Sequence, residues 1–462
     1  MKKQRFLSIF LVVFLLAGLL AVPAAAAEED AASFSYPTVA AKSALLVDGD
    51  TGQVLLNQNA HEQLYPASIT KCMTVLLVLQ AVDRGDISLD QTVTASQTAI
   101  NLLTADSSSA GIKVGEQLTV EQLLYCVMVQ SANEACYILA EVVSGSVDAF
   151  VDEMNAEAER LGCENTHFVN PCGLHDPEHY TTAWDVYLVT KEAMQYSMFM
   201  TLASTKTYTL PATNLSEERT FHTTNYLIDR WRATEYVYPY AKGIKTGHTS
   251  DAGYCLVSCA EKGGRSLISV VLGAEAVSEN GRTDVKSFSE TRRLFEWGFS
   301  SFDRATILNH ADLVEQVPVT LSRRANYVSI HPAEDVEVLL PSNLTAEDLK
   351  QDIQLDADSV AAPVAEGQKL GTITVTDSDG NVYASVDLLA ANEVPASRVL
   401  TILHKLQVFF SNPLMKILAA VIVVLALVLL IRRLRRRPSR YRGGQSYLTR
   451  RRNHRYHGRR RR

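Results

Sequence analysis

The stretch Ser68-Ile69-Thr70-Lys71 places a hydroxyl and an amine three residues apart, where the apolar segment SITKCMTVLLVLQAV begins. One helical turn would put Ser68 and Lys71 on the same face, within reach of each other. A serine hydroxyl is a weak nucleophile at neutral pH and needs an adjacent base to take its proton. A lysine is such a base only when neutral, and burial and a neighbouring cation both favour the neutral form. The pair therefore predicts a nucleophile and its base, provided that a second cation lies nearby.

Lys245, in the tripeptide Lys245-Thr246-Gly247, is the candidate for that second cation. A strand that begins Lys-Thr-Gly offers a charge and a hydroxyl to a carboxylate, and the glycine leaves room for a backbone to approach. Ser131 and Asn133 fall in a break between two helical segments. We expect this serine to relay a proton and the amide to hold a substrate peptide. Each motif is short, so the prediction depends on all three in this order, at a helix start, a turn between helices and a strand.

The order of the predicted elements indicates how these residues meet. Two apolar runs around the turn at 48–52 predict a hairpin, and residues 118–143 have interrupted helical spacing. Two β-rich runs within 242–274 predict an antiparallel pair, and 290–299 predict a closing helix. Strands first, helices in the middle and strands last imply an α/β fold rather than a doubly wound one. We expect an antiparallel sheet flanked by helices, with an inserted helical region, over residues 34–300.

Residues 305–395 have a different character from the first domain. They contain short β segments with turn signals, as in GTITVTDSDGNVYASVDLL. This pattern predicts a small all-β sandwich domain. The segment holds no catalytic cluster, and we expect it to space the first domain from a membrane.

Both ends of the chain carry targeting signals. Residues 1–27 combine a basic start, a short apolar run and small residues at Ala-x-Ala spacing, which predicts a cleaved secretory signal peptide. Residues 413–431 are almost wholly apolar and match the ~20 residues that cross a bilayer as a helix. The tail 432–462 holds fifteen arginines and no acid, so the positive-inside rule places it in the cytoplasm. We expect a single-pass protein of the cell membrane with an extracytoplasmic catalytic domain.

Charge and cysteine content narrow the classes of function. The chain carries a net charge of −7, and −25 remains once the tail's fifteen arginines and the three cations of the N-terminus are set aside. An acidic body argues against nucleic-acid binding, which needs a basic face.

The seven cysteines lack metal-ligand spacing. Cys126, Cys136 and Cys255 fall in apolar segments and are predicted to be buried thiols, whereas Cys163 and Cys172 flank a loop and could pair.

The motifs and the segments around them resemble one known family. Ser-x-x-Lys, Ser-x-Asn and Lys-Thr-Gly occur together in class A β-lactamases and penicillin-binding proteins. Over about residues 41–299 the chain is similar to low-molecular-mass penicillin-binding proteins, the serine-type D-alanyl-D-alanine carboxypeptidases, and its β domain and anchor fit their layout. The resemblance implies a DD-peptidase/β-lactamase-like fold. The segments that carry it are LLVDGDTGQVLLNQNAHEQLYPASITKCMT, IKVGEQLTVEQLLYCVMVQSANEA, NTHFVNPCGL, HYTTAWD, TTNYL and GIKTGHTSDAGYCLV.

The resemblance also implies a role for each motif residue. Ser68 would be acylated with release of a terminal D-alanine, Lys71 would be the base, and Ser131 and Asn133 would complete the catalytic set. The backbone N–H groups of Ser68 and His248 would form an oxyanion hole. The implied substrate-binding residues, of which the first two would clamp the substrate carboxylate, are Lys245, Thr246, Gly247, His248 and Thr249.

Two positions depart from the family's usual residues. Glu134 stands where the family usually has aspartate, and Cys172 where a small hydroxyl residue or alanine is common. Neither touches the roles above. The resemblance implies no metal and no organic cofactor, because serine–lysine chemistry is complete with side chains. The implied partners are peptidoglycan stem peptides, β-lactam antibiotics as inhibitors and the cytoplasmic membrane.

Other classes of protein share parts of this pattern. A β-lactamase has the same acylation machinery, but its Glu-x-x-Leu-Asn loop is missing between the second and third motifs. A DD-transpeptidase or endopeptidase differs little in sequence, and the short single-module chain favours a carboxypeptidase. A metallo-carboxypeptidase built on the acids and histidines of 175–179 would lack its His-Glu-x-x-His pattern. A muropeptide-binding sensor or scaffold without turnover would normally have lost Ser68, Lys71 or Lys245.

Overall fold

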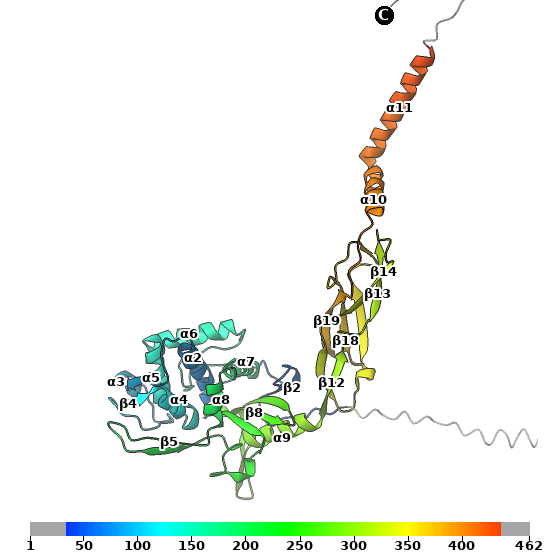
Figure 1. Ribbon diagram of the computed structural model, residues 1–462. Helices are drawn as coiled ribbons and strands as arrows, with labels where there is room; N and C mark the ends of the chain where they lie inside the picture. The colour runs from blue at the N-terminus through cyan, green and yellow to red at the C-terminus, as the bar shows by residue number, and fades with distance from the viewer. Residues whose placement is uncertain (1–33, 436–462) are drawn as a thin grey trace, which may run out of the picture. The chain divides into compact units, whose positions relative to one another are not determined.

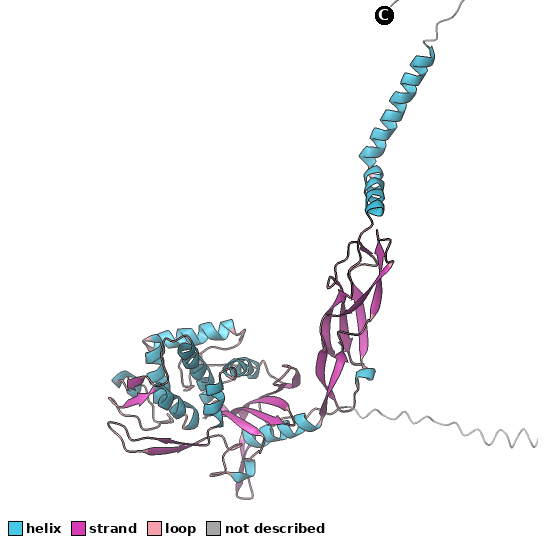
Figure 2. Cartoon of the chain, viewed as in Figure 1, coloured by secondary structure: helices cyan, strands magenta, loops and turns pink. Residues whose placement is uncertain are grey.

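The computed structural model describes residues 34–435 of the chain (Figures 1 and 2). The predicted signal peptide (1–27) and nearly all of the predicted Arg-rich tail lie outside the described residues. The described chain forms two compact units. The first contains the residues up to Asn309 together with 335–352 and 374–384, and the second contains 310–334, 353–373 and the residues from 385 onwards.

A five-stranded antiparallel sheet, in the order β2-β1-β9-β8-β7, forms the centre of the first unit. Ser43 of β1 pairs with Leu272 of β9, so strands from the two ends of this region lie side by side, as predicted. β7 is an edge strand of the sheet and pairs there with β8 alone. The strands are β1 (Ser43–Asp48), β2 (Val54–Gln58), β7 (Ala241–Thr249), β8 (Gly253–Lys262) and β9 (Arg265–Ala274).

Both faces of this sheet are covered, because successive side chains of a strand point to opposite faces. Leu45 and Val47 of β1 belong to a core shared with the helical region, whereas Ala44 and Leu46 pack in a second core with α9 (Lys286–Ser300). Figure 1 shows α9 on one side and the other helices gathered on the other. The predicted α/β fold is confirmed. The helices of the first face are α2 (Lys71–Asp83), α4 (Val120–Val129), α5 (Asn133–Ser144), α6 (Val147–Arg160), α7 (Ala183–Ala193) and α8 (Ser197–Ser204).

Short elements connect these helices and strands. The predicted break at 131–133 separates α4 from α5, and Ser131 adopts a positive φ of 63° as the chain turns. α4 begins with a capping box between Thr119 and Gln122, which satisfies free N–H groups at its start. The short elements are η1 (Ala67–Thr70), β3 (Thr92–Thr94), α3 (Gln97–Asn101), β4 (Gln117–Thr119), β5 (Thr207–Leu210), β6 (Arg219–His222), η2 (Thr234–Tyr236), β10 (Ala276–Glu279) and β11 (Arg282–Val285).

The segment after α9 is all-β, as predicted. A two-stranded sheet pairs β12 with β15, and a six-stranded sheet has the order β16-β18-β19-β14-β13-β17. Val317 and Val319 point inward along β13 while their neighbours are exposed, which is the period of a strand with one buried face. The elements are β12 (Phe302–Leu308), β13 (Glu315–Thr320), β14 (Tyr327–Pro332), β15 (Val336–Pro341), η3 (Ala346–Asp348), β16 (Lys350–Leu355), β17 (Val360–Ala361), β18 (Lys369–Thr376) and β19 (Val382–Ala390).

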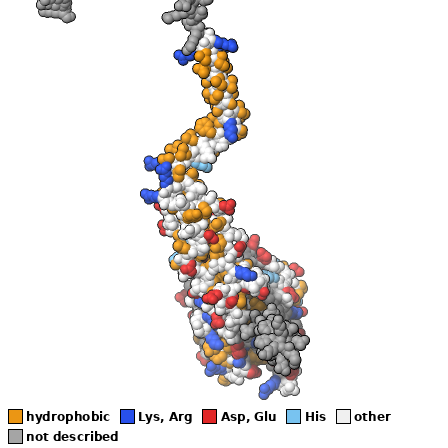
Figure 3. Space-filling model, turned by 90° about the vertical axis from the view of Figure 1, so that its right-hand side faces the viewer, with side chains coloured by type: hydrophobic (Ala, Val, Ile, Leu, Met, Phe, Trp, Pro, Cys, Tyr) orange, Lys and Arg blue, Asp and Glu red, His pale blue; other side chains and the backbone are white. Residues whose placement is uncertain are grey.

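Two apolar helices follow, α10 (Arg398–Ser411) and α11 (Pro413–Arg435). α11 contains the predicted span 413–431 and is long and apolar enough to cross a membrane by length and composition. Figure 3 shows many hydrophobic side chains on the visible surface of both helices, interrupted by basic and polar ones.

All seven cysteines are buried and unpaired. Burial is thus confirmed for Cys126, Cys136 and Cys255. The alternative that Cys163 and Cys172 pair is wrong in this structure, because the two thiols have different partners. Cys163 Sγ donates to the Asp185 carbonyl at 3.8 Å, whereas Cys172 Sγ lies 3.3 Å from the Tyr137 hydroxyl.

Candidate active site

Ser68 lies in η1, a single 3₁₀ turn that runs directly into α2. Residues i and i+3 eclipse each other on such a turn, and Lys71 Nζ accordingly donates to Ser68 Oγ at 2.9 Å. Ser68 is half-buried, whereas Lys71 is fully buried. The structure therefore brings the predicted nucleophile and base together, with one side of the serine open to the surface.

The Lys71 amine also joins the second motif to the first. Its Nζ donates to Asn133 Oδ1 at 2.8 Å and to the Cys172 carbonyl at 2.7 Å. These two acceptors and Ser68 Oγ match the three donors of an ammonium group. Ser131, two residues before Asn133, is buried in the same turn between α4 and α5. Lys71 is thus the central group of the site.

The third motif lies on the edge strand β7, which passes close to η1. A Cβ added at Gly247 would lie 2.8 Å from the Pro66 carbonyl oxygen and 3.0 Å from the Ser68 nitrogen. Only a residue without a side chain allows this approach. Thr246 Oγ1 lies 2.5 Å from Thr224 Oγ1, so a second hydroxyl stands beside the predicted carboxylate clamp.

Lys245 is the second fully buried lysine of the site. Burial, followed by the positive charge of Lys71, lowers the pKa of Lys245 to about 7. Its Nζ donates to the Thr246 carbonyl at 2.9 Å. The predicted second cation therefore lies close enough to Lys71 for the Lys71 charge to lower the pKa of Lys245.

The last two predicted residues occupy the end of β7. The ring of His248 is exposed and lies against Tyr254, with ring centroids 4.2 Å apart. Thr249 Oγ1 accepts a hydrogen bond from the Ala252 N–H at 3.0 Å, which shapes the turn into β8. The structure does not join the Thr249 side chain to the serine–lysine network.

A loop residue that the sequence analysis missed places the Cys172 carbonyl on Lys71. Asn170 Oδ1 accepts hydrogen bonds from the backbone N–H groups of Cys172, Gly173 and Leu174. An asparagine side chain that accepts hydrogen bonds from the backbone N–H groups just after it stabilises a tight turn. The sequence Asn-Pro-Cys-Gly carries this turn signal and could have indicated an organised loop.

Glu134, which stands next to the second motif where the family usually has aspartate, has a buried carboxylate that binds the loop at 108–110. Its Oε1 accepts hydrogen bonds from Ser109 Oγ and from the Ala110 N–H, both at 2.7 Å. The Asn133 N–H donates to the Ser108 carbonyl at 2.8 Å. The loop at 108–110 is thus fastened to the start of α5, next to the amide that contacts Lys71.

We expect Glu134→Ala to lower the free energy of unfolding by about 3 kcal/mol, because the buried Ala110 N–H and the part-buried Ser109 hydroxyl would lose their acceptor. Chemical denaturation of the full chain measures the change. Glu134→Gln keeps an acceptor oxygen at the same reach and should cost clearly less. An alanine variant within about 0.5 kcal/mol of the parent would contradict this role.

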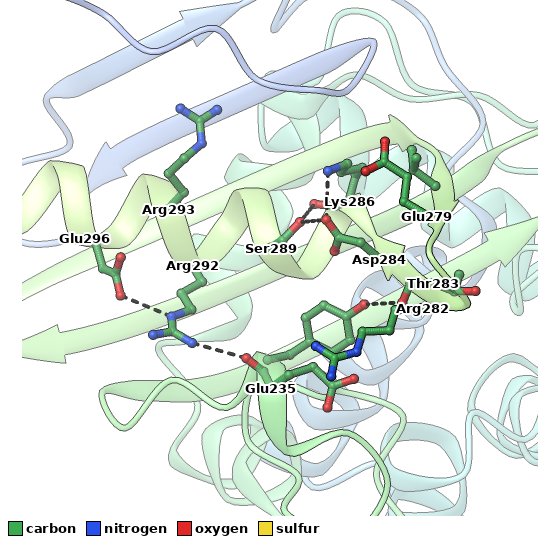
Figure 4. Close-up of a pocket in the computed structure, with 12 residues that line it drawn as sticks. Glu235, Glu279, Arg282, Thr283, Asp284, Lys286, Ser289, Arg292, Arg293 and Glu296 are labelled. Atoms are coloured by element: carbon green, nitrogen blue, oxygen red, sulfur yellow. Dashed lines mark hydrogen bonds and ion pairs between the residues drawn. The ribbon is translucent and has the colours of Figure 1, made fainter.

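A large cavity lies elsewhere, between η2, the β10–β11 hairpin and α9 (Figure 4). Its volume is about 920 Å³, and none of the predicted site residues lines it. Its charges are largely paired: Lys286 Nζ lies 2.7 Å from Asp284, and Arg292 Nε lies 3.1 Å from Glu296. We assign no chemistry to this cavity.

The histidines and acids of 175–179 do not converge. His179 is buried against Thr70, whereas His175 Nδ1 lies 3.8 Å from an Asp251 carboxylate oxygen. Within residues 34–435, no group of three or more His, Cys, Asp or Glu side chains is placed to hold a metal ion.

Comparison with known proteins identifies the family. The family model "D-alanyl-D-alanine carboxypeptidase" matches residues 30–276, and the model of the penicillin-binding protein 5 C-terminal domain matches 302–396. The D-alanyl-D-alanine carboxypeptidase DacF of Bacillus subtilis is 32% identical over 402 residues, 87% of this chain and 97% of the relative.

Solved structures agree with this match. Penicillin-binding protein 5 of Haemophilus influenzae superposes with a TM-score of 0.63 at 30% identity, covering 78% of this chain and 99% of that one. The Streptomyces K15 DD-transpeptidase gives a TM-score of 0.52 at 31% identity, covering 58% and 99%. The chain therefore belongs to the serine-type D-alanyl-D-alanine carboxypeptidase family.

Proposed function

We propose that this enzyme removes the terminal D-alanine of peptidoglycan stem pentapeptides through an acyl-enzyme on Ser68. The observation that carries the proposal is the 2.9 Å hydrogen bond between Lys71 Nζ and Ser68 Oγ, in a setting where the lysine is fully buried. A buried amine beside a partly open hydroxyl is the arrangement that activates a serine. The family relationship supplies the substrate class.

In this proposal, neutral Lys71 takes the Ser68 proton while Oγ attacks the carbonyl carbon of the penultimate D-alanine. The N–H groups of Ser68 and His248 would stabilise the oxyanion. The C–N bond then breaks, the leaving amine takes a proton from Lys71 through Ser131, and free D-alanine departs. Water attacks the acyl-enzyme by the reverse proton transfers and releases the shortened peptide. Asn133 would hold the substrate's peptide group.

The two lysines would work together when substrate binds. The terminal carboxylate of the peptide, docked on Lys245 and Thr246, would favour the charged form of Lys245. The charged Lys245 would hold the substrate carboxylate while Lys71 acts as the base. Gly247 lets β7 lie directly against η1, and the Thr249 side chain contributes only by stabilising the turn into β8.

The surroundings of the enzyme are part of the proposal. We propose that α11 anchors the protein in the cytoplasmic membrane, with residues 34–300 as the catalytic domain and 305–395 as the β domain on the outer side. The signal peptide and the basic tail would set this orientation. β-Lactam antibiotics would acylate Ser68 as substrate mimics and inhibit the enzyme.

The test uses the full chain in detergent with a diacyl-Lys-D-Ala-D-Ala peptide. We expect D-alanine release and covalent labelling by a fluorescent penicillin, both abolished in Ser68→Ala. Ser278→Ala, in the other Ser-x-Asn of the chain, is exposed and should change neither. Labelling without D-alanine release, but with transfer to an amine acceptor, would identify a transpeptidase. Rapid loss of free penicillin would identify a β-lactamase.

The charge of Lys245 predicts the pH dependence of the reaction. Because the pKa of Lys245 is about 7, this lysine loses its positive charge as the pH rises through 7. We expect kcat/KM for the carboxylate-terminated peptide to fall above that pH, since kcat/KM reports the free enzyme. A peptide ending in D-alaninamide has no carboxylate and should not show this fall. The same fall with both peptides would contradict the role of Lys245 as a clamp.

A further inference from the structure

We propose that Thr70 and His179 are positioning residues that fix the peptide group between Ala67 and Ser68, and so aim the Ser68 N–H at the developing oxyanion. The proposal rests on the acyl-enzyme mechanism proposed above and adds two side chains to it. Both are buried, and neither is one of the residues to which the proposed mechanism gives a role; Thr70 occupies a variable position of Ser-x-x-Lys.

A directed chain of hydrogen bonds links the two side chains to the nucleophile's turn. The Val169 N–H donates to His179 Nδ1 at 3.0 Å, so the ring hydrogen must sit on Nε2. Nε2 then donates to Thr70 Oγ1 at 2.8 Å. The Thr70 hydroxyl hydrogen is left to donate to the Ala67 carbonyl at 2.9 Å.

The His179 ring stays in the neutral form that this series of hydrogen bonds requires. Burial, the largest cause, lowers the pKa of His179 to about 4. The imidazole is therefore neutral at physiological pH, and its Nδ1 can accept a hydrogen bond. Each of the three hydrogen bonds between the Val169 N–H and the Ala67 carbonyl therefore has one donor and one acceptor.

The Ala67 carbonyl matters because it shares a planar peptide with the Ser68 nitrogen. In a trans peptide the C=O and N–H bonds point in opposite directions. A hydrogen bond that fixes the Ala67 oxygen therefore fixes the direction of the Ser68 N–H on the other side. Ala67 also has a φ of 47°, a left-handed conformation that a residue with a side chain seldom adopts without support.

The surrounding loop leaves this carbonyl little freedom. Gly173 packs on Ala67 so closely that a Cβ there would overlap the carbonyl group. The same loop is held on α2 by two further bonds, from Thr74 Oγ1 to the Pro171 carbonyl at 2.5 Å and from Lys71 to Cys172. Removal of the Thr70 hydroxyl would therefore leave the loop attached, while the Ala67 carbonyl loses its donor and His179 Nε2 loses its acceptor.

The experiment compares Thr70→Val, which has the same shape without the hydroxyl, with Thr70→Ser, which keeps the hydroxyl. We expect Thr70→Val to lower the rate constant of acylation by penicillin about 10- to 100-fold, in line with a weakened oxyanion-hole donor. Thr70→Ser should restore the rate to within about threefold. Thr190→Val removes a buried hydroxyl that makes no hydrogen bond and should leave the rate unchanged.

A spectroscopic readout separates positioning from loss of structure. The infrared stretch of the penicilloyl ester carbonyl reports its hydrogen bonds directly, and we expect a higher frequency in Thr70→Val than in the parent or Thr70→Ser. If Thr70→Val does not fold, Thr70→Ala is measured in the same way.

The outcomes distinguish this inference from the proposed function. A parent-like rate and carbonyl band in Thr70→Val, or a Thr70→Ser protein as slow as Thr70→Val, would overturn the positioning role alone. Absence of labelling of the parent at Ser68 would overturn the acyl-enzyme itself and this inference with it.

Discussion

Replacement of Lys71 by methionine should slow acylation of the enzyme by about 10²- to 10⁴-fold, the range expected for loss of a general base. Methionine nearly fills the same buried space but cannot accept the Ser68 proton. The variant also leaves Asn133 Oδ1 and the Cys172 carbonyl without their common donor. The rate of covalent labelling by a fluorescent penicillin measures the effect.

A lysine on the neighbouring strand provides the control. Lys242, at the start of β7, is exposed and lies 3.5 Å from Glu261, and Lys242→Met should label at the parental rate. A Lys71→Met protein that labels within about threefold of the parent would show that another group takes the proton. We also expect the pKa of Lys245 to rise in Lys71→Met, because one of the two causes that lower it is removed.

Replacement of Gly247 by alanine should reduce acylation about 10²-fold without unfolding the protein. The new Cβ would lie 2.8 Å from the Pro66 carbonyl oxygen and 3.0 Å from the Ser68 nitrogen. These are backbone atoms, which cannot rotate away, so β7 must move back from η1. A displacement of about 1 Å between catalytic groups costs about this factor. Penicillin labelling and thermal unfolding should be measured together.

Gly298 in α9 offers a matched steric control. A Cβ there would lie 2.8 Å from side-chain carbons of Leu46 and Leu267, on the opposite face of the sheet. Leucine side chains can shift, so Gly298→Ala should lower the melting temperature slightly and leave acylation unchanged. Equal losses of acylation in both variants would mean that Gly247 acts through stability rather than through the position of β7.

Much of the fold was predictable because it depends on local patterns. The turn signal at 48–52 forms the β1–β2 hairpin, and the glycines at 263–264 join β8 to β9. The helical break at 131–133 also occurs where expected. Helix α10 was not predicted as a separate element, although its apolar residues recur at helical spacing. Its boundary with α11 lies at Asn412-Pro413, where proline begins a new helix.

The site was only partly predictable, for a physical reason. The contact between Ser68 and Lys71 follows from their spacing along one turn. The contacts of Lys71 with the Cys172 carbonyl and of Thr246 with Thr224 depend on how distant loops pack. A backbone carbonyl has no residue-type signal, because every residue has one. The Asn170 turn and the Thr70–His179 bond became visible only once the fold placed those loops beside α2.

The pairing of β1 with β9 has a consequence for how the chain folds while it is being synthesised. The sheet cannot close until residues 265–274 have followed the first strand out of the ribosome, since Ser43 pairs with Leu272. Before that, β1 has only the β2 hairpin partner, and an isolated hairpin is at best marginally stable in water. The growing chain therefore has no closed central sheet until residues 265–274 are available to pair with β1. The apolar helix α11 is synthesised only after the sheet has all of its strands.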